Sequence, residues 1–214
     1  MRISEKTIER LSLFRRVLGR LQESGVQNVY SHELASLSHS SPEIVRRDLM
    51  ATGYTGSPAK GYEVQGLIET IDTVLDGPVE QRIALVGVGN LGRAMLSFFR
   101  GKRQRLSIVL AFDLSAEKVG RVLFGTPILP VDGMETLLKE NRVALGVITV
   151  PAAAAQSVAD RLVAGGVQGI LNFSPVPLRV PRDVYVEDID LTMAIEKVAF
   201  YARQRARHNP EEQA

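Results

Sequence analysis

Val86-Gly87-Val88-Gly89-Asn90-Leu91-Gly92 is the stretch that decides the fold of this 214-residue chain. It follows an apolar run, Ile83–Val86, that predicts a buried strand, and it opens a helical pattern over Leu91–Phe99. In such a loop the first glycine makes the tight turn, the second lets the backbone approach a pyrophosphate, and the third lets helix and strand pack closely. Phosphates then lie at the positive end of the helix. The spacing predicts a dinucleotide site formed by Gly87, Val88, Gly89, Asn90, Leu91 and Gly92.

Asp113 strengthens this interpretation, because it closes the next predicted strand, Ile108–Phe112, 21 residues beyond Gly92. A carboxylate at that place can accept hydrogen bonds from the ribose hydroxyls on the adenine side of a dinucleotide. It would also repel a 2′-phosphate, so the sequence favours NAD (NADH and NAD⁺) over NADP(H). The alternative is an ordinary helix N-cap after a strand.

Apolar runs alternate with helical patterns through the rest of the chain. Strands are expected at Val143–Val150, Gly169–Phe173 and Val184–Val186, and helices at Met134–Asn141, Ala152–Ala164 and Leu191–Arg207. This alternation is typical of an α/β fold with a parallel sheet covered on both faces, here a Rossmann domain over residues 78–190. Two strand ends are further candidates for cofactor contact, with plain strand-to-helix turns as the equal alternative: Thr149, Val150 and Pro151, then Asn172, Ser174 and Pro175.

Residues 1–77 follow a different pattern, which predicts a separate domain. The chain from Ser4 to Gly25 predicts an amphipathic helix, and His32–Leu37 a short one with Ser31 as its N-cap. Ser41-Pro42-Glu43 then starts a helix in the favoured way, with serine at the N-cap and proline at the first helical position. The turn-forming residues Gly53–Tyr62 predict a hairpin wing.

The helix that starts at Pro42 is expected to expose Arg46 and Arg47 side by side. Residues 1–62 hold nine Lys/Arg against six Asp/Glu, whereas the other 152 residues hold seventeen against eighteen. A helix, a turn and a basic helix form a helix-turn-helix, whose second helix enters the major groove of DNA. The sequence therefore predicts a winged helix-turn-helix domain that binds double-stranded DNA; the alternative for the arginine pair is a solvated helix face.

Other function classes are excluded or disfavoured by composition. The chain has no cysteine, which excludes disulfides, thiol redox chemistry and cysteine-ligated zinc, and we expect no metal site. It has neither a secretory signal nor an apolar run of the ~18 residues that a membrane span needs, so we expect a cytoplasmic protein without membrane contact. The three histidines lie outside residues 40–207, and we expect no catalytic residue. The remaining proton carriers of the Rossmann domain are interpreted as surface residues: Tyr185, Lys102, Lys118 and Lys139.

In this order, the motifs of the chain resemble the Rex family of bacterial redox-sensing transcriptional repressors. The resemblance rests on Ile44–Leu49, Val86–Gly92, Phe112-Asp113 with Glu117–Gly120, Val150-Pro151, Gly169–Val176 and Val186–Leu191. It implies a homodimer that binds operator DNA with an inverted repeat, and whose C-terminal segment, residues 191–214, places a helix on the partner by domain swapping. It also implies that NAD⁺ permits operator binding and that NADH releases the DNA.

The resemblance assigns roles to single residues as well. It implies DNA contacts by Arg16, Ser41, Arg46, Arg47, Lys60 and Tyr62, and a switch formed by Arg16, Phe98 and Asp190. The family wing usually has arginine and glycine where this chain has Pro58 and Ala59, and Lys60 is the expected substitute for the positive charge. Many members have tyrosine at Phe98, so an Arg16–Asp190 ion pair is expected to carry the switch without that hydroxyl.

Two rival functions remain open at this point. The first is an NAD-dependent oxidoreductase with an accessory helical domain, which turnover of carbonyl substrates would distinguish. The second is a CoA-binding module, since Val150-Pro151 before an alanine-rich helix also resembles the Rossmann domain of acyl-CoA synthetase subunits. Asp113 disfavours CoA, because it suits a dinucleotide ribose.

Overall fold

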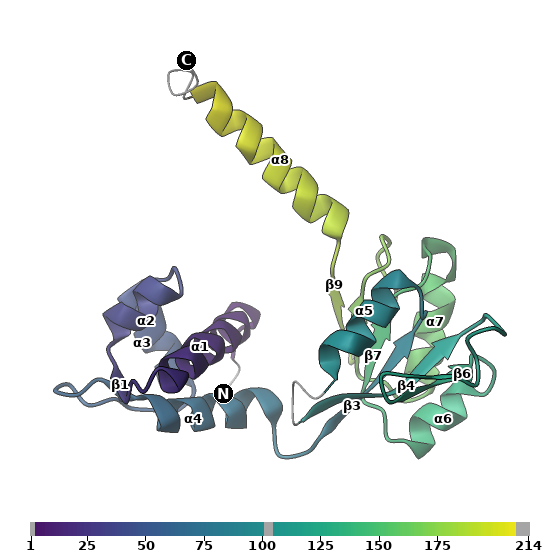
Figure 1. Ribbon diagram of the computed structural model, residues 1–214, viewed down its shortest axis with the longest axis horizontal. Helices are drawn as coiled ribbons and strands as arrows, with labels where there is room; N and C mark the ends of the chain where they lie inside the picture. The colour runs from purple at the N-terminus through teal and green to yellow at the C-terminus, as the bar shows by residue number, and fades with distance from the viewer. Residues whose placement is uncertain (1–2, 101–104, 209–214) are drawn as a thin grey trace. The chain divides into compact units, whose positions relative to one another are not determined.

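The computed structural model describes residues 3–100 and 105–208, and these form two compact units, residues 1–79 and 80–214 (Figure 1). Lys102 and the end of the expected C-terminal segment, residues 209–214, lie outside the described residues. Within the described part of the chain, no helix is both long enough and apolar enough to cross a membrane.

The N-terminal unit packs its helices around one apolar core. Its elements are α1 (Glu5–Glu23), β1 (Asn28–Val29), α2 (Ser31–Leu37), α3 (Pro42–Ala51), β2 (Tyr62–Glu63) and α4 (Val64–Asp76). Fully buried side chains come from each long helix, with Phe14 on α1, Leu49 on α3 and Leu67 on α4. The expected helix-turn-helix is α2 followed by α3.

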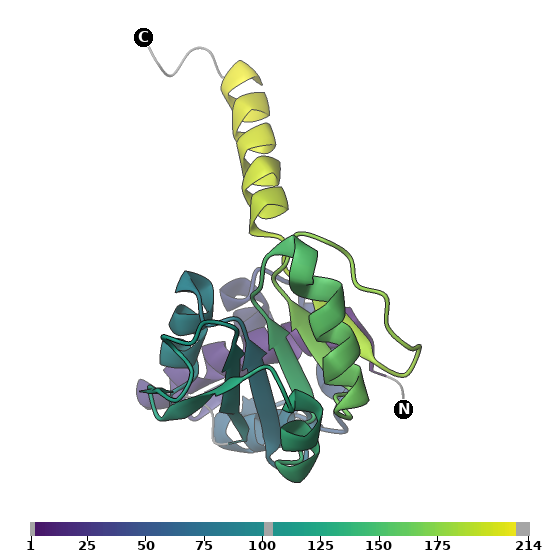
Figure 2. The same cartoon turned by 90° about the vertical axis from the view of Figure 1, so that its right-hand side faces the viewer.

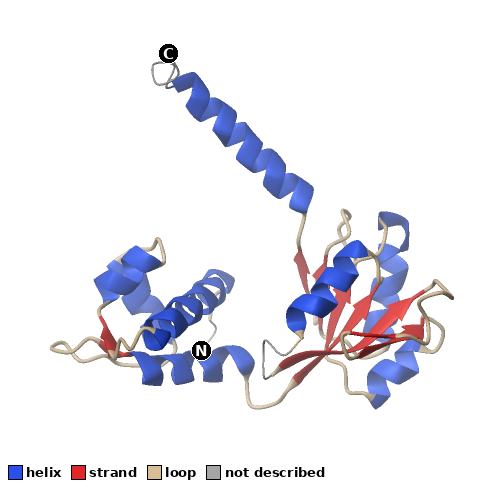
Figure 3. Ribbon diagram, viewed as in Figure 1, coloured by secondary structure: helices blue, strands red, loops and turns tan. Residues whose placement is uncertain are grey.

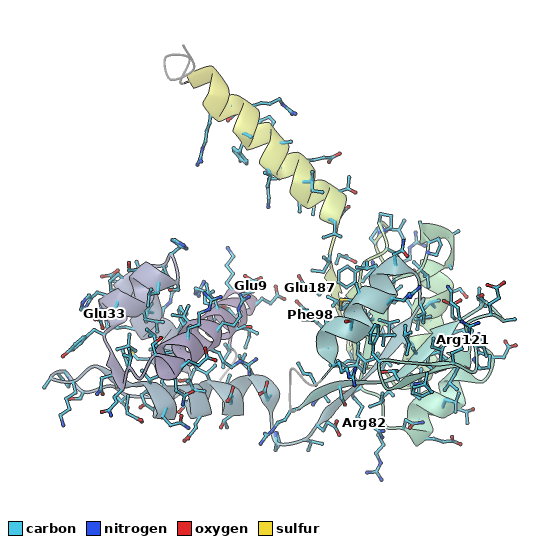
Figure 4. All side chains as sticks on the ribbon, viewed as in Figure 1. Glu9, Glu33, Arg82, Phe98, Arg121 and Glu187 are labelled. Carbon is cyan, nitrogen blue, oxygen red and sulfur yellow. The ribbon has the colours of Figure 1, made fainter. Side chains whose placement is uncertain are left out.

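Two local details differ from the expectation. Tyr30 rather than Ser31 is the N-cap of α2, and its N–H donates to the Glu33 carboxylate over 2.7 Å (Glu33 is labelled in Figure 4). The expected wing hairpin is reduced to a single bridge between Ser57 and Gly61. The residues after the wing form β2, which pairs with β1 and not with residues 53–56.

The second unit is a seven-stranded sheet with helices on both faces (Figure 3). The strand order is β5-β6-β4-β3-β7-β8-β9, and every pairing is parallel except β5 with β6. The strands are β3 (Gln81–Val86), β4 (Leu106–Asp113), β5 (Val122–Leu123), β6 (Thr126–Pro130), β7 (Leu145–Ile148), β8 (Gly169–Asn172) and β9 (Tyr185–Asp188). The helices are α5 (Asn90–Phe99), α6 (Met134–Glu140), α7 (Ala152–Ala164) and α8 (Leu191–His208).

The alternation of side chains along β3 explains the two covered faces. Ala84 and Val86 join the core beneath α6 and α7, whereas Ile83 and Leu85 join the core beneath α5. Figure 2 shows α7 in front of the sheet. The reversal of strand order at β3, between β4 and β7, is the switch point at which doubly wound sheets bind ligands.

Strands β5 and β6 were not predicted from the sequence, and the range predicted for β7 was too long. Prolines at 127 and 130 weaken the strand pattern of β6. The strand expected over Val143–Val150 ends at Ile148, so that residues 149–151 form the turn into α7. This shorter strand brings the turn to the carboxyl edge of the sheet.

Candidate dinucleotide site and DNA-binding surface

The three glycines of the loop after β3 meet different surroundings. Gly87 has a φ of +98°, and a Cβ there would lie 2.7 Å from the Thr149 carbonyl oxygen. A Cβ on Gly92 would lie 2.0 Å from the Gly87 carbonyl oxygen. A Cβ on Gly89 would meet nothing within 4 Å. Gly87 and Gly92 therefore shape the turn, and Gly89 leaves open space where a phosphate group can approach the N-terminus of α5.

Asp113, at the end of β4, is held against this loop. Its Oδ2 accepts the N–H of Val88 at 2.7 Å and the Lys118 ammonium at 3.0 Å, and its Oδ1 accepts the N–H of Ser115 at 2.8 Å. Burial favours a higher pKa for Asp113, but the donors at Ser115, Lys118 and Val88 outweigh it and lower the pKa below its ordinary value. The carboxylate is therefore charged at neutral pH and fixed in orientation.

A mostly apolar cavity of about 550 Å³ lies at this edge of the sheet. Of the expected cofactor residues, its lining includes Gly87, Gly89, Asp113, Val150 and Pro151. Its size and its few polar groups are typical of a small-molecule site.

An ion pair borders the same cavity on the α7 side. Arg161 donates to both carboxylate oxygens of Glu135, at 2.6 and 3.0 Å. The Arg161 hydrogen bonds lower the pKa of Glu135 to about 2. This pair ties α6 to α7 and keeps Arg161, which lines the cavity, from turning freely.

The other expected cofactor residues do not line this cavity. Asn172 is fully buried and links three segments: it donates to the Val176 carbonyl oxygen and to Asp188, and it accepts from the N–H of Ser174. Ser174 donates to the Val150 carbonyl oxygen at 2.6 Å and, with Pro175, lines a separate hollow of about 200 Å³. Ser174 thus supports the turn that contains Val150, and Asn172 holds Ser174 in place.

Sequence reasoning missed Lys118, which it placed on the surface. The side chain is 40% exposed, but its ammonium pairs with Asp113 and lines the cavity. The sequence held one signal for this contact: Lys118 follows Asp113 by five residues, and a single turn of the chain can bring two residues at that spacing together.

On the N-terminal unit, the outward side of α3 carries the candidate DNA-binding surface. Arg46 and Arg47 are exposed there and border a shallow hollow with Glu43 and Met50. Arg46 donates to the Ser31 hydroxyl at 3.1 Å and pairs with Glu43 at 3.3 Å, so its guanidinium is held at the helix surface. Ser41 caps α3, since its hydroxyl accepts the N–H of Ile44 at 3.4 Å.

The opposite side of α3 is fixed to α1 by a buried carboxylate. Asp48 is 1% exposed and accepts hydrogen bonds from Thr7 and from Nε and Nη2 of Arg10. A bidentate arginine–carboxylate pair is among the stronger polar contacts in proteins. The direction in which α3 presents its arginines therefore depends on α1.

The remaining expected DNA-binding residues lie in the wing. Lys60 is exposed. Tyr62 is half-buried: it packs on the core, with its ring centre 6.3 Å from that of Tyr54. Lys60 is thus free to reach a ligand, whereas Tyr62 supports the base of the wing.

The expected switch residues are divided between the two units. Arg16 is exposed on α1. Asp190 precedes α8 and accepts the N–H of Met193 at 2.9 Å, which makes it a cap of that helix. Phe98, labelled in Figure 4, is 55% exposed on α5, and its ring contacts Phe99 edge-on. No group of three metal-ligating side chains occurs among the described residues.

A helix-turn-helix unit joined to a Rossmann unit with a dinucleotide loop defines a DNA-binding regulator with a nucleotide-binding domain. Family models agree with this division: one described as a CoA binding domain matches residues 79–176, and one described as a putative DNA-binding protein N-terminus matches residues 2–49.

Relatives and solved structures identify the family. The chain is 39% identical to the redox-sensing transcriptional repressor Rex of Geobacillus kaustophilus, over 94% of each protein. It is 37% identical to Rex of Rhodopirellula baltica, over 95% of this chain and 86% of the relative. The structure of RSP with β-NAD⁺ and operator DNA aligns with a TM-score of 0.89 and 26% identity over all of both chains. RSP with β-NADH aligns with a TM-score of 0.86 and 26% identity, over 98% of this chain and 99% of that one. The chain belongs to the Rex family of redox-sensing transcriptional repressors.

Proposed function

We propose that this protein represses transcription by binding an inverted-repeat operator through α3 while its Rossmann unit holds NAD⁺, and that NADH releases the operator. The observation that carries this proposal is the presence in one chain of two sites: the exposed arginines of α3, and the cavity lined by the glycine loop, Asp113 and α7. Because the ligand would be operator DNA, the protein is expected to work in the cytoplasm. The test is operator binding measured during titration with NADH and with NAD⁺.

In this proposal Arg46 and Arg47 contact the major groove, and replacing both with alanine should greatly weaken operator binding. Arg46→Ala alone is expected to cost about 1–3 kcal/mol if it makes a base contact, and to relax sequence preference at one position of each half-site. Lys60→Ala should instead weaken binding to all sequences and reduce the salt dependence. Fluorescence anisotropy with operator variants at several salt concentrations measures both effects. Undiminished operator affinity in the Arg46→Ala/Arg47→Ala variant would remove α3 from the interface.

Asp113 is expected to make NADH bind more tightly than NADPH, because a 2′-phosphate would face a charged carboxylate at close range. In Asp113→Ala this preference should narrow. Titration of the intrinsic fluorescence of NADH and NADPH measures both affinities. Equal affinities in the unmutated protein would contradict the assignment of Asp113 to the ribose.

We further propose that the working form is a homodimer in which α8 packs against the second copy by domain swapping. Support comes from α8 itself, whose apolar side chains are 49–69% exposed: Leu191, Met193, Ile195, Val198, Phe200 and Tyr201. A patch of this kind is covered in soluble proteins by a partner. Sedimentation of the unmutated protein and of Ile195→Glu/Val198→Glu tests it, with the variant expected to sediment as a monomer.

CoA binding is the second candidate, since the matching family model over residues 79–176 is described as a CoA binding domain. CoA carries a phosphate on its ribose, and Asp113 would oppose that group as it opposes a 2′-phosphate. Adding CoA to the titration separates the candidates: NADH should bind more tightly than CoA. Incubation with NADH and a panel of carbonyl compounds tests the remaining enzymatic alternative, and we expect no oxidation of NADH.

A further inference from the structure

The hydrogen bonds at Asp113 leave it little capacity for a ribose. An ionised carboxylate has about four acceptor positions. Three are used, two on Oδ2 by Val88 and Lys118 and one on Oδ1 by Ser115. A nucleotide ribose offers two neighbouring hydroxyls as donors, so Asp113 cannot accept both while these three contacts persist.

Lys118 has the capacity that Asp113 lacks. Its ammonium carries three donors, and one of them is used by Asp113. The side chain is 40% exposed and lines the same cavity as Asp113. A ribose hydroxyl that donates to Oδ1 of Asp113 would therefore leave its neighbour within reach of a lysine donor.

We propose that Asp113 and Lys118 bind the adenine-side ribose together, and that Lys118 limits how strongly the site rejects a 2′-phosphate. This inference rests on the placement of the ribose at Asp113 proposed above. A 2′-phosphate is repelled by the Asp113 carboxylate but attracted by the Lys118 ammonium, which lies 3.0 Å from that carboxylate. Asp113 sets the direction of the preference for NADH, and Lys118 reduces its size.

The test compares NADH and NADPH affinities, without DNA, in the unmutated protein, Lys118→Met, Asp113→Asn and the double variant. Lys118→Met should weaken NADH a few-fold and NADPH about tenfold more than NADH, because the phosphate loses its counter-charge. This extra loss should shrink at high salt. The matched control is Lys139→Met, which removes an exposed lysine outside the cavity lining and should leave both affinities within about twofold.

The Asp113→Asn background separates a direct role of Lys118 from a purely supporting one. If Lys118 acts on the phosphate itself, Lys118→Met still weakens NADPH selectively when the carboxylate is gone. If Lys118 only orients the carboxylate, its replacement weakens both cofactors equally and has no effect in that background, and the proposal is overturned. Lys118→Gln, which keeps a polar side chain of similar length, repeats the measurement should Lys118→Met unfold at a lower temperature.

Failure of the ribose placement gives a different pattern. In that case Asp113→Asn leaves the ratio of NADH to NADPH affinity unchanged, and the proposed site is wrong together with this inference. If instead the ratio of NADH to NADPH affinity narrows in Asp113→Asn but does not widen in Lys118→Met, the proposed ribose site is retained and only the role of Lys118 is rejected.

Discussion

Arg10→Ala is expected to destabilise the N-terminal unit by about 3 kcal/mol, since breaking a buried ion pair by removing one partner leaves an uncompensated charge. Asp48 is the buried partner, at 1% exposure, and Arg10 the partly exposed one, at 23%. Once Arg10 is gone, the carboxylate keeps the Thr7 hydroxyl at 3.1 Å as a donor. The free energy of unfolding, measured in urea, checks this expectation.

Two variants control for the loss of packing and of a surface charge. Arg20→Ala removes an exposed arginine from the same helix and should change stability by less than about 0.5 kcal/mol. Arg10→Met/Asp48→Leu replaces both charges with apolar groups and should recover much of the loss, as is often the case for buried ion pairs. A loss below about 1 kcal/mol in Arg10→Ala would show that water reaches Asp48 and that the pair does not fix α3.

The second large effect is expected in the coupling between NADH binding and operator binding. Because a ligand shifts a conformational equilibrium only by its differential affinity, NADH must bind the DNA-free arrangement more tightly if it releases the operator. Operator DNA must then weaken NADH by the same factor, typically about 5- to 150-fold. Operator affinity measured across an NADH titration, and NADH affinity measured with and without operator, should give equal factors. If NADH leaves operator affinity unchanged in the unmutated protein, the proposed redox response is wrong.

We propose that Asp190 links the two sites, through the ion pair with Arg16 that the resemblance to the Rex family implies. Since Asp190 also caps α8, Asp190→Ala removes two interactions at once. Asp190→Asn keeps the capping oxygen and removes the charge, so it isolates the ion pair. It should weaken operator binding while leaving NADH affinity for the free protein equal or tighter. Arg16→Gln should do the same, and the double variant should add nothing further.

The parts of the molecule that local patterns describe were predicted well. The glycine loop, the strand before it and Asp113 are confined to about 30 residues, and each step depends on neighbouring positions. The helix-turn-helix followed from capping residues and apolar spacing for the same reason. Domain limits and the roles of single site residues remain predictions.

The features that were not predicted are of two kinds: contacts between residues far apart in the sequence, and strands whose own residues give a weak strand pattern. Arg10 and Asp48 are 38 positions apart, and periodicity assigns each to its own helix without pairing them. Ser31 looked like an N-cap, whereas its hydroxyl accepts from Arg46 in the next helix. Lys118 looked like a surface lysine because nothing local shows that the chain turns back toward Asp113. Strand β6 depends on its pairing with β4 and β5 more than on its own residues.

Two glycines of the loop after β3 are required for different reasons: Gly92 for folding and Gly89 for binding the cofactor. Gly92 has the Gly87 carbonyl oxygen 2.0 Å from where a Cβ would stand, so any side chain there conflicts with the fold itself. Gly89 has an ordinary φ of −80° and open space around it, so the folded protein tolerates alanine at that position. A library of variants sorted only for folding would thus keep substitutions at Gly89 and lose those at Gly92. Sorting for release of repression by NADH would remove both, because a side chain at Gly89 would occupy the space that the cofactor needs.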